Sequence, residues 1–556
     1  MGLGDEHVIA NHRHNSTRQQ PQRRVGQIGS RSARTGQALL LFVAGVVAWR
    51  PFETFPWSAP LTAAVALVVI LWIWQQVTLP PLGRLWIAGA ALAVLVGSGL
   101  AGLDPAAAVA EASLLAGACA LAWLASRDVP PPQWPAILGL VLSGLSVWGI
   151  LQVTAGPEHA EAVLAQIPEH LRVAAAERLG AGRAFASQPL PSHLAVLLAT
   201  ALPLLLAQVK WSWRAVVWMV GALLCVVGLA ATRSPIGVGL ALASCLALAI
   251  ARGRRRVLVP VLVLAAVLLL VVLGRGDVLE LEPVKLRVDN WQTAVWIWST
   301  SPAHGVGFGG FGQAVQTAPL HVGNRPRHAH SLPMEWLAEF GPVGFLMTLI
   351  AGLALLWLLK GLWPKRPDLA VALAVVPAHN LADFSFFSSG VVVPWAVLLG
   401  WGIAICAGER RAESGAWGRL LVVAAAALVL AFTTLHATSV TVGGGVGLAP
   451  EERFANAVRA RELAPWRAEP LVAIAVGALE SGDAELIARA ARELDQARWL
   501  RPRSASVADL RGLLAEKRGE GPTAVSEAWT AAHDNPSDPT FSARFEGRVE
   551  RLSGGR

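Results

Sequence analysis

The run AVLLATALPLLLAQV, residues 195–209, carries no charged side chain. LTAAVALVVILWIWQQV (61–77) and VLVPVLVLAAVLLLVVLG (257–274) have the same character. A helix needs about 20 mostly apolar residues to cross a bilayer. These runs approach that length, so they predict membrane-spanning helices and decide the fold class.

The composition of the whole chain agrees with this reading. Of 556 residues, 54% are hydrophobic and only 15% are charged, whereas about 25% of a typical soluble domain is charged. We attribute the net charge of +9 to membrane topology, and we expect no nucleic-acid partner. The first apolar run follows roughly 37 polar residues without a small-residue cleavage site, so no cleavable signal peptide is expected. The four cysteines lie in or beside apolar runs and offer no disulfide framework.

Length and flanking charge predict about 12–13 spans, that is, an all-α polytopic transmembrane helix bundle. We expect the spans near 37–53, 58–77, 85–103, 105–125, 134–153, 190–209, 214–231, 235–251, 256–274, 334–359, 368–386, 391–407 and 417–437.

Lys and Arg in the short connections set the expected orientation, since these residues favour the cytoplasmic side. Residues 1–36 form a basic tail, which we expect to be cytoplasmic and disordered. Later basic clusters fall on the same side of the membrane. The opposite side, the periplasm, then receives the loops 154–189 and 275–333 and the C-terminus.

Composition changes after the last span, and we take 37–437 as the membrane domain and 450–556 as a small, soluble, periplasmic helical domain. The later part is rich in Ala, Arg and Glu with a helical period. Pro465, Pro502 and Pro536 are 37 and 34 residues apart, close to the 34-residue period of tetratricopeptide repeats. The tail is therefore predicted to be tetratricopeptide-like, with a possible protein partner. A generic helical tail stays open as the alternative.

GVGFGG, residues 305–310, fits the string G-x-G-x-x-G. No hydrophobic strand precedes it and no clear helix follows, so a dinucleotide site is not supported. We expect a tight turn whose glycines let the backbone lie close to another segment.

The stretch RPRHAHSLPMEWLAEFGPVGF, 325–345, gathers ionisable groups beside a predicted span. His328 and His330, with His321, could bind a metal, but the spacing fits no standard zinc pattern. Glu335 and Glu339 are four residues apart on one helical face and should point away from lipid, into the bundle or a wet cavity. Arg325, Arg327 and His328 are expected at the lipid surface.

Other ionisable residues belong to the same predicted side of the membrane. They are Arg178, Arg183, Arg233, Arg287, His379 and Asp383. Guanidinium groups bind phosphate oxygens bidentately and keep their charge at any biological pH. A histidine can take a proton from an attacking hydroxyl. The set suits a lipid-linked phosphate or diphosphate as ligand.

Several segments together resemble the O-antigen ligase/polymerase superfamily. HAHSLPMEWLAEFGPVG is similar to the family's H-x10-G signature, with His330, Glu339 and Gly341. RVDNWQTAVWIWSTSPAHGVGFGGFG resembles its block around Arg287, TRSPIG its turn with Arg233, and PAHNLADFSFF its later His…Asp segment. The resemblance covers roughly residues 180–405.

Two positions depart from the pattern of that family. Gln188-Pro189 with Ser192-His193 stands where Asn-Pro-Asn is usual, and His330-Ser331 stands where His-Asn is usual. These changes bear on the acceptor more than on the core chemistry.

The resemblance implies a multi-pass glycosyltransferase of the GT-C type in the bacterial cell inner membrane, acting in lipopolysaccharide biosynthesis or as a polysaccharide polymerase. It would move a glycan from undecaprenyl diphosphate to an acceptor at the periplasmic face, with inversion and without a metal or other cofactor. His330 would be the general base. Arg287 and Arg233, assisted by Arg183 or Arg178, would bind the diphosphate. Glu339 would orient His330 or an arginine, with Glu335, His379 and Asp383 in supporting roles.

Three acceptors remain possible at this stage: a glycan, lipid A-core, and a protein in the case of a protein O-oligosaccharyltransferase. A transporter would also place polar groups inside a bundle, but it should show inverted repeats, which the sequence lacks. A non-catalytic membrane scaffold whose tail recruits partners is the third class of function.

Overall fold

The computed structural model describes residues 20–50, 103–166, 169–209, 215–253, 282–318, 326–407, 450–465, 467–501, 504–535 and 539–553. The helices before residue 408 are α1 (Gln20–Trp49), α4 (Pro105–Ala125), α5 (Trp134–Thr154), α6 (Pro157–Gln166), α7 (Glu169–Gly180), α8 (Pro191–Leu206), α9 (Ala215–Thr232), α10 (Pro235–Arg252), α12 (Glu282–Thr300), α13 (Phe311–Ala314), η1 (Val315–Thr317), α14 (Leu332–Phe340), α15 (Pro342–Leu362), α16 (Pro367–His379), η2 (Ser385–Phe387) and α17 (Ser389–Ala407). The C-terminal helices are α19 (Pro450–Leu463), α20 (Glu469–Ser481), α21 (Ala484–Leu500), α22 (Ala505–Lys517), α23 (Gly521–Asp534) and α24 (Pro539–Ser553).

The protein is an all-α membrane protein, as predicted, and its described residues contain no strand. Five described helices are long and apolar enough to cross a membrane: α5, α9, α10, α15 and α17. The predicted spans 58–77, 256–274 and 417–437, and nearly all of 85–103, lie outside the described residues.

Two predicted spans were wrong in their limits. The span expected at 334–359 is broken at Gly341, whose φ of +65° ends α14 before Pro342 starts α15. Pro at the first turn suits a new helix, and a left-handed φ favours glycine. The span expected at 368–386 stops at His379, because residues 380–388 fold into a loop with one short 3₁₀ turn. Both departures shape the candidate site.

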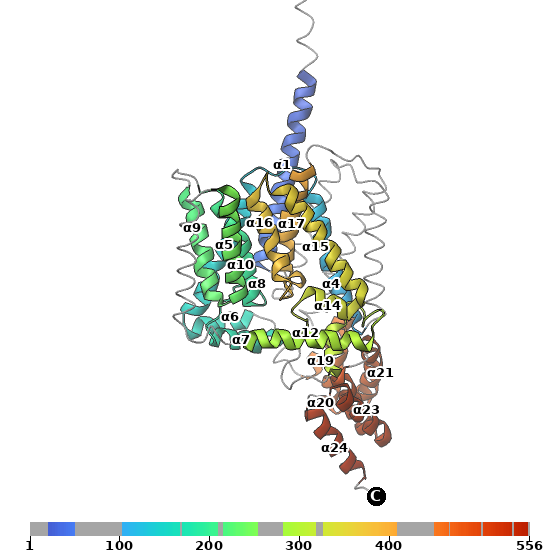
Figure 1. Cartoon of the computed structure of the whole chain (residues 1–556). Coiled ribbons are helices and arrows are strands. Elements are labelled where there is room, and N and C mark those ends of the chain that lie inside the picture. The colour runs from blue at the N-terminus through green and yellow to red at the C-terminus, as the bar shows by residue number, and fades with distance from the viewer. Residues whose placement is uncertain are drawn as a thin grey trace, which may run out of the picture.

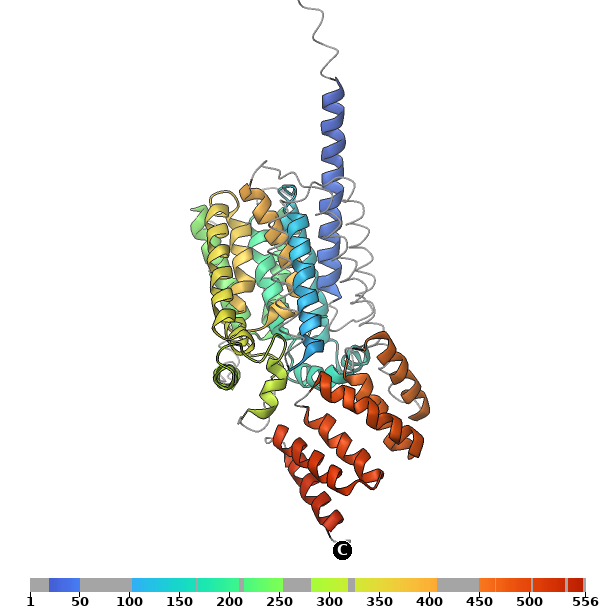
Figure 2. The same cartoon turned by 90° about the vertical axis from the view of Figure 1, so that its right-hand side faces the viewer.

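The core of the bundle is built around α8, which is buried from Pro191 to Leu205. α5, α9, α10 and α16 pack against it. Such complete burial explains why this run is apolar on all sides. α1 packs on α17, where buried Trp401 donates a hydrogen bond of 2.6 Å to Gln37. Figure 2 shows α1 extending beyond the other bundle helices at one end.

The opposite end of the bundle carries the remaining elements. α12 lies crosswise over this end, and the C-terminal helices are found at the same end (Figure 1). From α19 to α24, each helix packs against the next along the chain, around buried residues that include Leu471, Ile474 and Leu494. This arrangement agrees with the predicted helical tail, while its tetratricopeptide nature stays a prediction. The polar groups of the sequence analysis lie at this end.

Candidate active site

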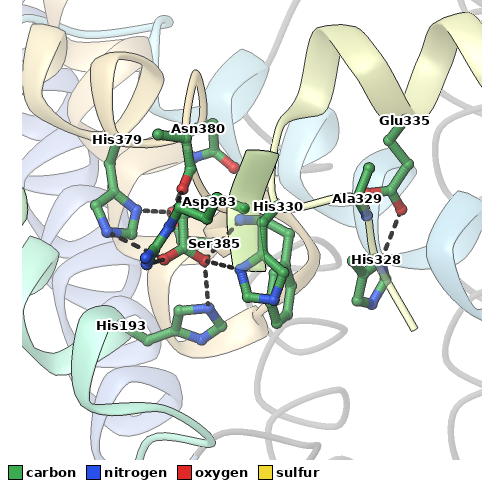
Figure 3. A network of polar contacts seen from close by, with 12 residues as sticks. His193, His328, Ala329, His330, Glu335, His379, Asn380, Asp383 and Ser385 are labelled. Atoms are coloured by element: carbon green, nitrogen blue, oxygen red, sulfur yellow. Dashed lines mark hydrogen bonds and ion pairs between the residues drawn. The ribbon is translucent and has the colours of Figure 1, made fainter. Parts of the chain in front are cut away.

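A buried carboxylate, that of Asp383, lies at the centre of the site. Its Oδ1 is 3.8 Å from His193 Nε2 and 3.7 Å from His330 Nδ1. Its Oδ2 is 3.6 Å from His379 Nε2 and 3.5 Å from an Arg287 guanidinium nitrogen. Figure 3 shows the three imidazoles around the carboxylate, from three separate segments. A charge without solvent must be compensated by partners, and Arg287 supplies the opposite charge.

The loop that carries Asp383 is held by Asn380. The Asn380 side chain donates to Ser385 Oγ at 2.8 Å and accepts from Phe386 N at 2.9 Å. Its backbone carbonyl accepts from Leu332 N at 2.9 Å. Ser385 Oγ also lies 3.0 Å from His379 Nδ1. These bonds fix the loop after α16 against the start of α14, which places Asp383 beside His330.

His330 has a backbone conformation that is rare for a side chain of its kind. Its φ is +53°, and a left-handed non-glycine residue costs of order 1 kcal/mol. The bond from Trp291 Nε1 to its carbonyl, 3.2 Å, and the edge of Phe384 at 4.8 Å hold it in place. Its side chain is 27% exposed, whereas Asp383 is fully buried. Since Nδ1 faces Asp383, Nε2 is the ring nitrogen left for an acceptor.

The electrostatic surroundings keep this imidazole neutral. Burial lowers the pKa of His330 to about 4; the Asp383 carboxylate opposes the shift and the Arg287 charge adds to it. Neutral imidazole has one N–H and one lone pair, and a carboxylate beside Nδ1 favours the proton there. Nε2 can then accept a proton at neutral pH.

Arginines adjoin the histidine cluster. Arg287 also donates from Nε to the Ala382 carbonyl at 2.8 Å. Arg233, with φ of +51°, donates to the Ala181 carbonyl at 2.6 Å, and Arg178 donates to the Pro189 carbonyl at 2.8 Å. Burial lowers the pKa of the Arg183 guanidinium, and the charges of Arg287 and Arg233 lower it further. The four arginines thus form an electropositive region next to Asp383.

Within the described ranges, this region holds more positive than negative charge. Arg178, Arg183 and Arg233 form no ion pair with a described carboxylate. The Nε atoms of Arg183 and Arg233 are buried without a hydrogen-bond partner among the residues described. Repelling guanidinium groups with open donors favour the binding of an anion.

His328 and Glu335 form a second, separate pair (Figure 3). Their atoms Nδ1 and Oε1 are 2.7 Å apart, and the other carboxylate oxygen accepts from Ala329 N at 3.0 Å. The His328 ring stacks on Phe384 and Phe387. The expectation that His328 lies at the lipid surface was wrong, since it is only 7% exposed. Its bond to Glu335 compensates for this burial.

Arg327 is exposed, and its position at the lipid surface stays a prediction. Arg325 and His321 lie outside the described residues.

Glu339 is buried as predicted, but it serves the glycine-rich turn and not His330. Its Oε1 accepts from Phe311 N at 3.3 Å, and its backbone carbonyl accepts from Gly307 N at 3.0 Å. A Cβ on Gly305, whose φ is +67°, would lie 2.3 Å from the Glu339 carbonyl carbon. The glycines therefore permit close backbone contact, as expected. The carboxylate that lies against His330 is that of Asp383.

His193 belongs to the site, although in the sequence it is marked only by a departure from a family pattern. It stands in the first turn of the apolar helix α8, fully buried, and a histidine inside such a run is the signal that could have identified it. Gln152 was missed as well. It accepts from Ala186 N at 2.7 Å and donates to the Ala186 carbonyl at 2.6 Å, which fixes the loop before α8.

A comparison with protein families bears on this part of the chain. Residues 219–349 match the family model described as O-antigen ligase. The match includes Arg233, Arg287 and His330, and it ends before His379 and Asp383. A comparison with curated proteins gave no match. Through residues 219–349, the chain is therefore similar to the O-antigen ligase family.

Proposed function

We propose that the protein is a glycosyltransferase that moves a glycan from undecaprenyl diphosphate to an acceptor hydroxyl at the periplasmic face of the bacterial inner membrane. The observation that carries the proposal is the partly exposed His330, 3.7 Å from buried Asp383 and next to a group of arginines. A base beside an anion-binding region is what a displacement at a sugar diphosphate requires.

The proposed step is a single displacement. His330 Nε2 takes the proton of the acceptor hydroxyl while that oxygen attacks the anomeric carbon of the donor sugar. The bond between that carbon and the diphosphate oxygen breaks, and its electron pair leaves with undecaprenyl diphosphate. Attack from the face opposite the leaving group inverts the anomeric carbon. Asp383 stabilises the imidazolium that forms.

The arginines have two roles in this proposal. Arg287 and Arg233, assisted by Arg183 or Arg178, neutralise the departing diphosphate, since charge that develops on the leaving group is stabilised by fixed cations. Arg233 and Arg178 also hold the loop before α8 through their bonds to the Ala181 and Pro189 carbonyls. No metal ion is assigned to the step, in keeping with the family resemblance.

A gene deletion restored with wild type, His330→Ala or His304→Ala tests the proposal. His304 is exposed and serves as the control histidine. Surface polysaccharide should return with wild type and His304→Ala and stay absent with His330→Ala. Long lipid-linked chains left unattached would identify a ligase, and single repeats on lipid A-core a polymerase. Full rescue by His330→Ala would refute the assignment of the base.

The C-terminal helices favour a second candidate, a protein O-oligosaccharyltransferase, because they adjoin the site-bearing end of the bundle and could recruit a protein acceptor. In the same deletion strain, unchanged polysaccharide together with under-glycosylated secreted protein would support this candidate over the first.

A further inference from the structure

A cavity of about 450 Å³ lies between the C-terminal helices and the segment α13–η1. Its volume is within the range of small-ligand sites, roughly 300–1,000 Å³. Gln313 and Gln316 line it from the bundle side, and residues of α19, α20 and α22 line it from the other. None of the site residues described above lines this cavity.

The cavity is lined by apolar and polar side chains, and the charges among the polar ones are matched. Arg453 pairs with Glu480 at 2.8 Å, and Arg501 pairs with Glu469 at 2.5 Å. Ser504 and Ser506 add hydroxyls to the two glutamine amides. Paired charges leave no net attraction for a free anion, while the hydroxyls, amides, guanidinium and carboxylate groups offer donors and acceptors side by side. A neutral ligand with many hydroxyl groups fits such a lining.

Some of these hydrogen-bonding groups are not used within the protein. Gln313 Oε1 is shielded from solvent and accepts no hydrogen bond from the described residues, and Arg453 Nε likewise lacks a hydrogen-bond partner there. Arg501 Nε makes no hydrogen bond either, but it lies 3.7 Å from a carboxylate oxygen of Asp104. Buried polar groups are normally paired, so each unpaired one asks for an explanation. Ligand hydroxyls in the cavity would supply the partners.

The wall that contains Gln313 also adjoins the candidate active site. At its start, Phe311 N donates to Glu339. At the next residue, a Cβ on Gly312 would lie 3.1 Å from the Arg327 carbonyl oxygen. α13 therefore separates the cavity from the segment 327–330, which ends at His330. A chain seated in the cavity would lie across α13 from the segment that ends at His330.

We propose that this cavity binds sugar units of a glycan chain engaged by the enzyme, as a subsite beyond the reacting residue. The inference rests on the proposed glycan transfer and adds to it a place for the distal part of the carbohydrate. A glycan held against α13 would be oriented towards His330, with its bound sugar units away from the reacting bond.

The test uses the full-length protein in lipid nanodiscs. The probe is the set of oligosaccharides released by mild acid from the lipid-linked glycans of the source bacterium, with binding followed by saturation-transfer difference NMR. Ser506→Trp fills the cavity and should weaken binding at least tenfold. Gln313→Ala removes one unpaired acceptor and should weaken it about fivefold. Ser526→Trp adds the same bulk to an exposed position of α23 outside the cavity and should bind like wild type.

Thermal unfolding of each variant keeps a folding defect apart from a binding defect. Wild-type binding by both Ser506→Trp and Gln313→Ala would overturn the inference. The inference would also be overturned if the wild-type protein binds a Ser/Gly-rich extended peptide and Ser506→Trp loses that binding while its binding of the oligosaccharides is unchanged. His330→Ala should lose transfer and keep oligosaccharide binding. Transfer that persists in His330→Ala refutes the proposed function alone, because the binding comparison does not depend on it.

Discussion

Asp383 and Glu339 are both fully buried carboxylates at the same end of the bundle, yet their partners differ in kind. Asp383 faces three imidazoles and a guanidinium. One of these imidazoles, that of His330, is partly exposed and can contact a substrate. Glu339 accepts from a backbone amide and supports the glycine-rich turn. Burial alone therefore does not identify a chemical role. The partners of a buried carboxylate determine whether its role is chemical or structural.

The sharpest way to break this comparison is to neutralise each carboxylate without changing its shape. Asp383→Asn removes the charge that favours the Nδ1 proton of His330 and stabilises the imidazolium, so transfer should fall by roughly 10²–10⁴-fold. Glu339→Gln keeps an oxygen for Phe311 N and should retain transfer within about fivefold, since one neutral hydrogen bond is worth about 1 kcal/mol. Turnover by purified protein with a lipid-linked donor measures both. Equal losses in the two variants would contradict the distinction.

A smaller effect is expected at Arg287, which touches Asp383 and belongs to the anion-binding region. Arg287→Lys keeps the charge but loses the planar fork that bonds the Ala382 carbonyl while it faces Asp383. Transfer should fall about 10–100-fold, the equivalent of a lost charge-assisted hydrogen bond. The same change at Arg366, which pairs with Asp368 at the start of α16, is the matched control and should leave transfer unchanged. A larger loss of transfer in Arg366→Lys than in Arg287→Lys would contradict a specific role for Arg287.

The smallest effect concerns the scaffold side and is measured as stability. Gly305 and Gly482 both have positive φ, +67° and +69°, but only Gly305 has backbone within reach of an added Cβ. Gly482→Ala should therefore cost only about 1 kcal/mol, through its backbone conformation. Gly305→Ala should cost more, because the turn must move away from Glu339. Thermal unfolding in detergent compares them, and an equal cost would mean that the close approach does not matter.

The sequence was sufficient for the fold class and for much of the site. Apolar runs such as 195–209 predict the bundle, because lipid demands helices whose length and composition are visible in the residues. Buried Glu335 and Glu339 followed from the cost of a carboxylate in lipid. The cluster of His330, Arg287 and Asp383 followed from a family resemblance, and the structure brings these three together.

What sequence reasoning missed depends on contacts between distant segments. His330 and His193 both face Asp383, which lies in the loop after α16, where the apolar run by itself predicts one continuous span. The assignment of Glu339 to His330 assumed that closeness along the chain means closeness in space. The pairing of His328 with Glu335 could have been inferred from their spacing, but nothing local showed that His328 is buried.

The central claim is that a neutral His330, held beside Asp383, takes the acceptor proton. The pH dependence of kcat/KM for transfer by the purified protein tests it most directly. Burial lowers the pKa of His330 to about 4, so the base stays deprotonated above that pH. The rate should be flat from about pH 8 to pH 5 and fall as pH drops through about 4. His330→Gln should be at least 100-fold slower and lack this step. A midpoint near 6.5, the ordinary value for histidine, or the same profile in His330→Gln would contradict the account.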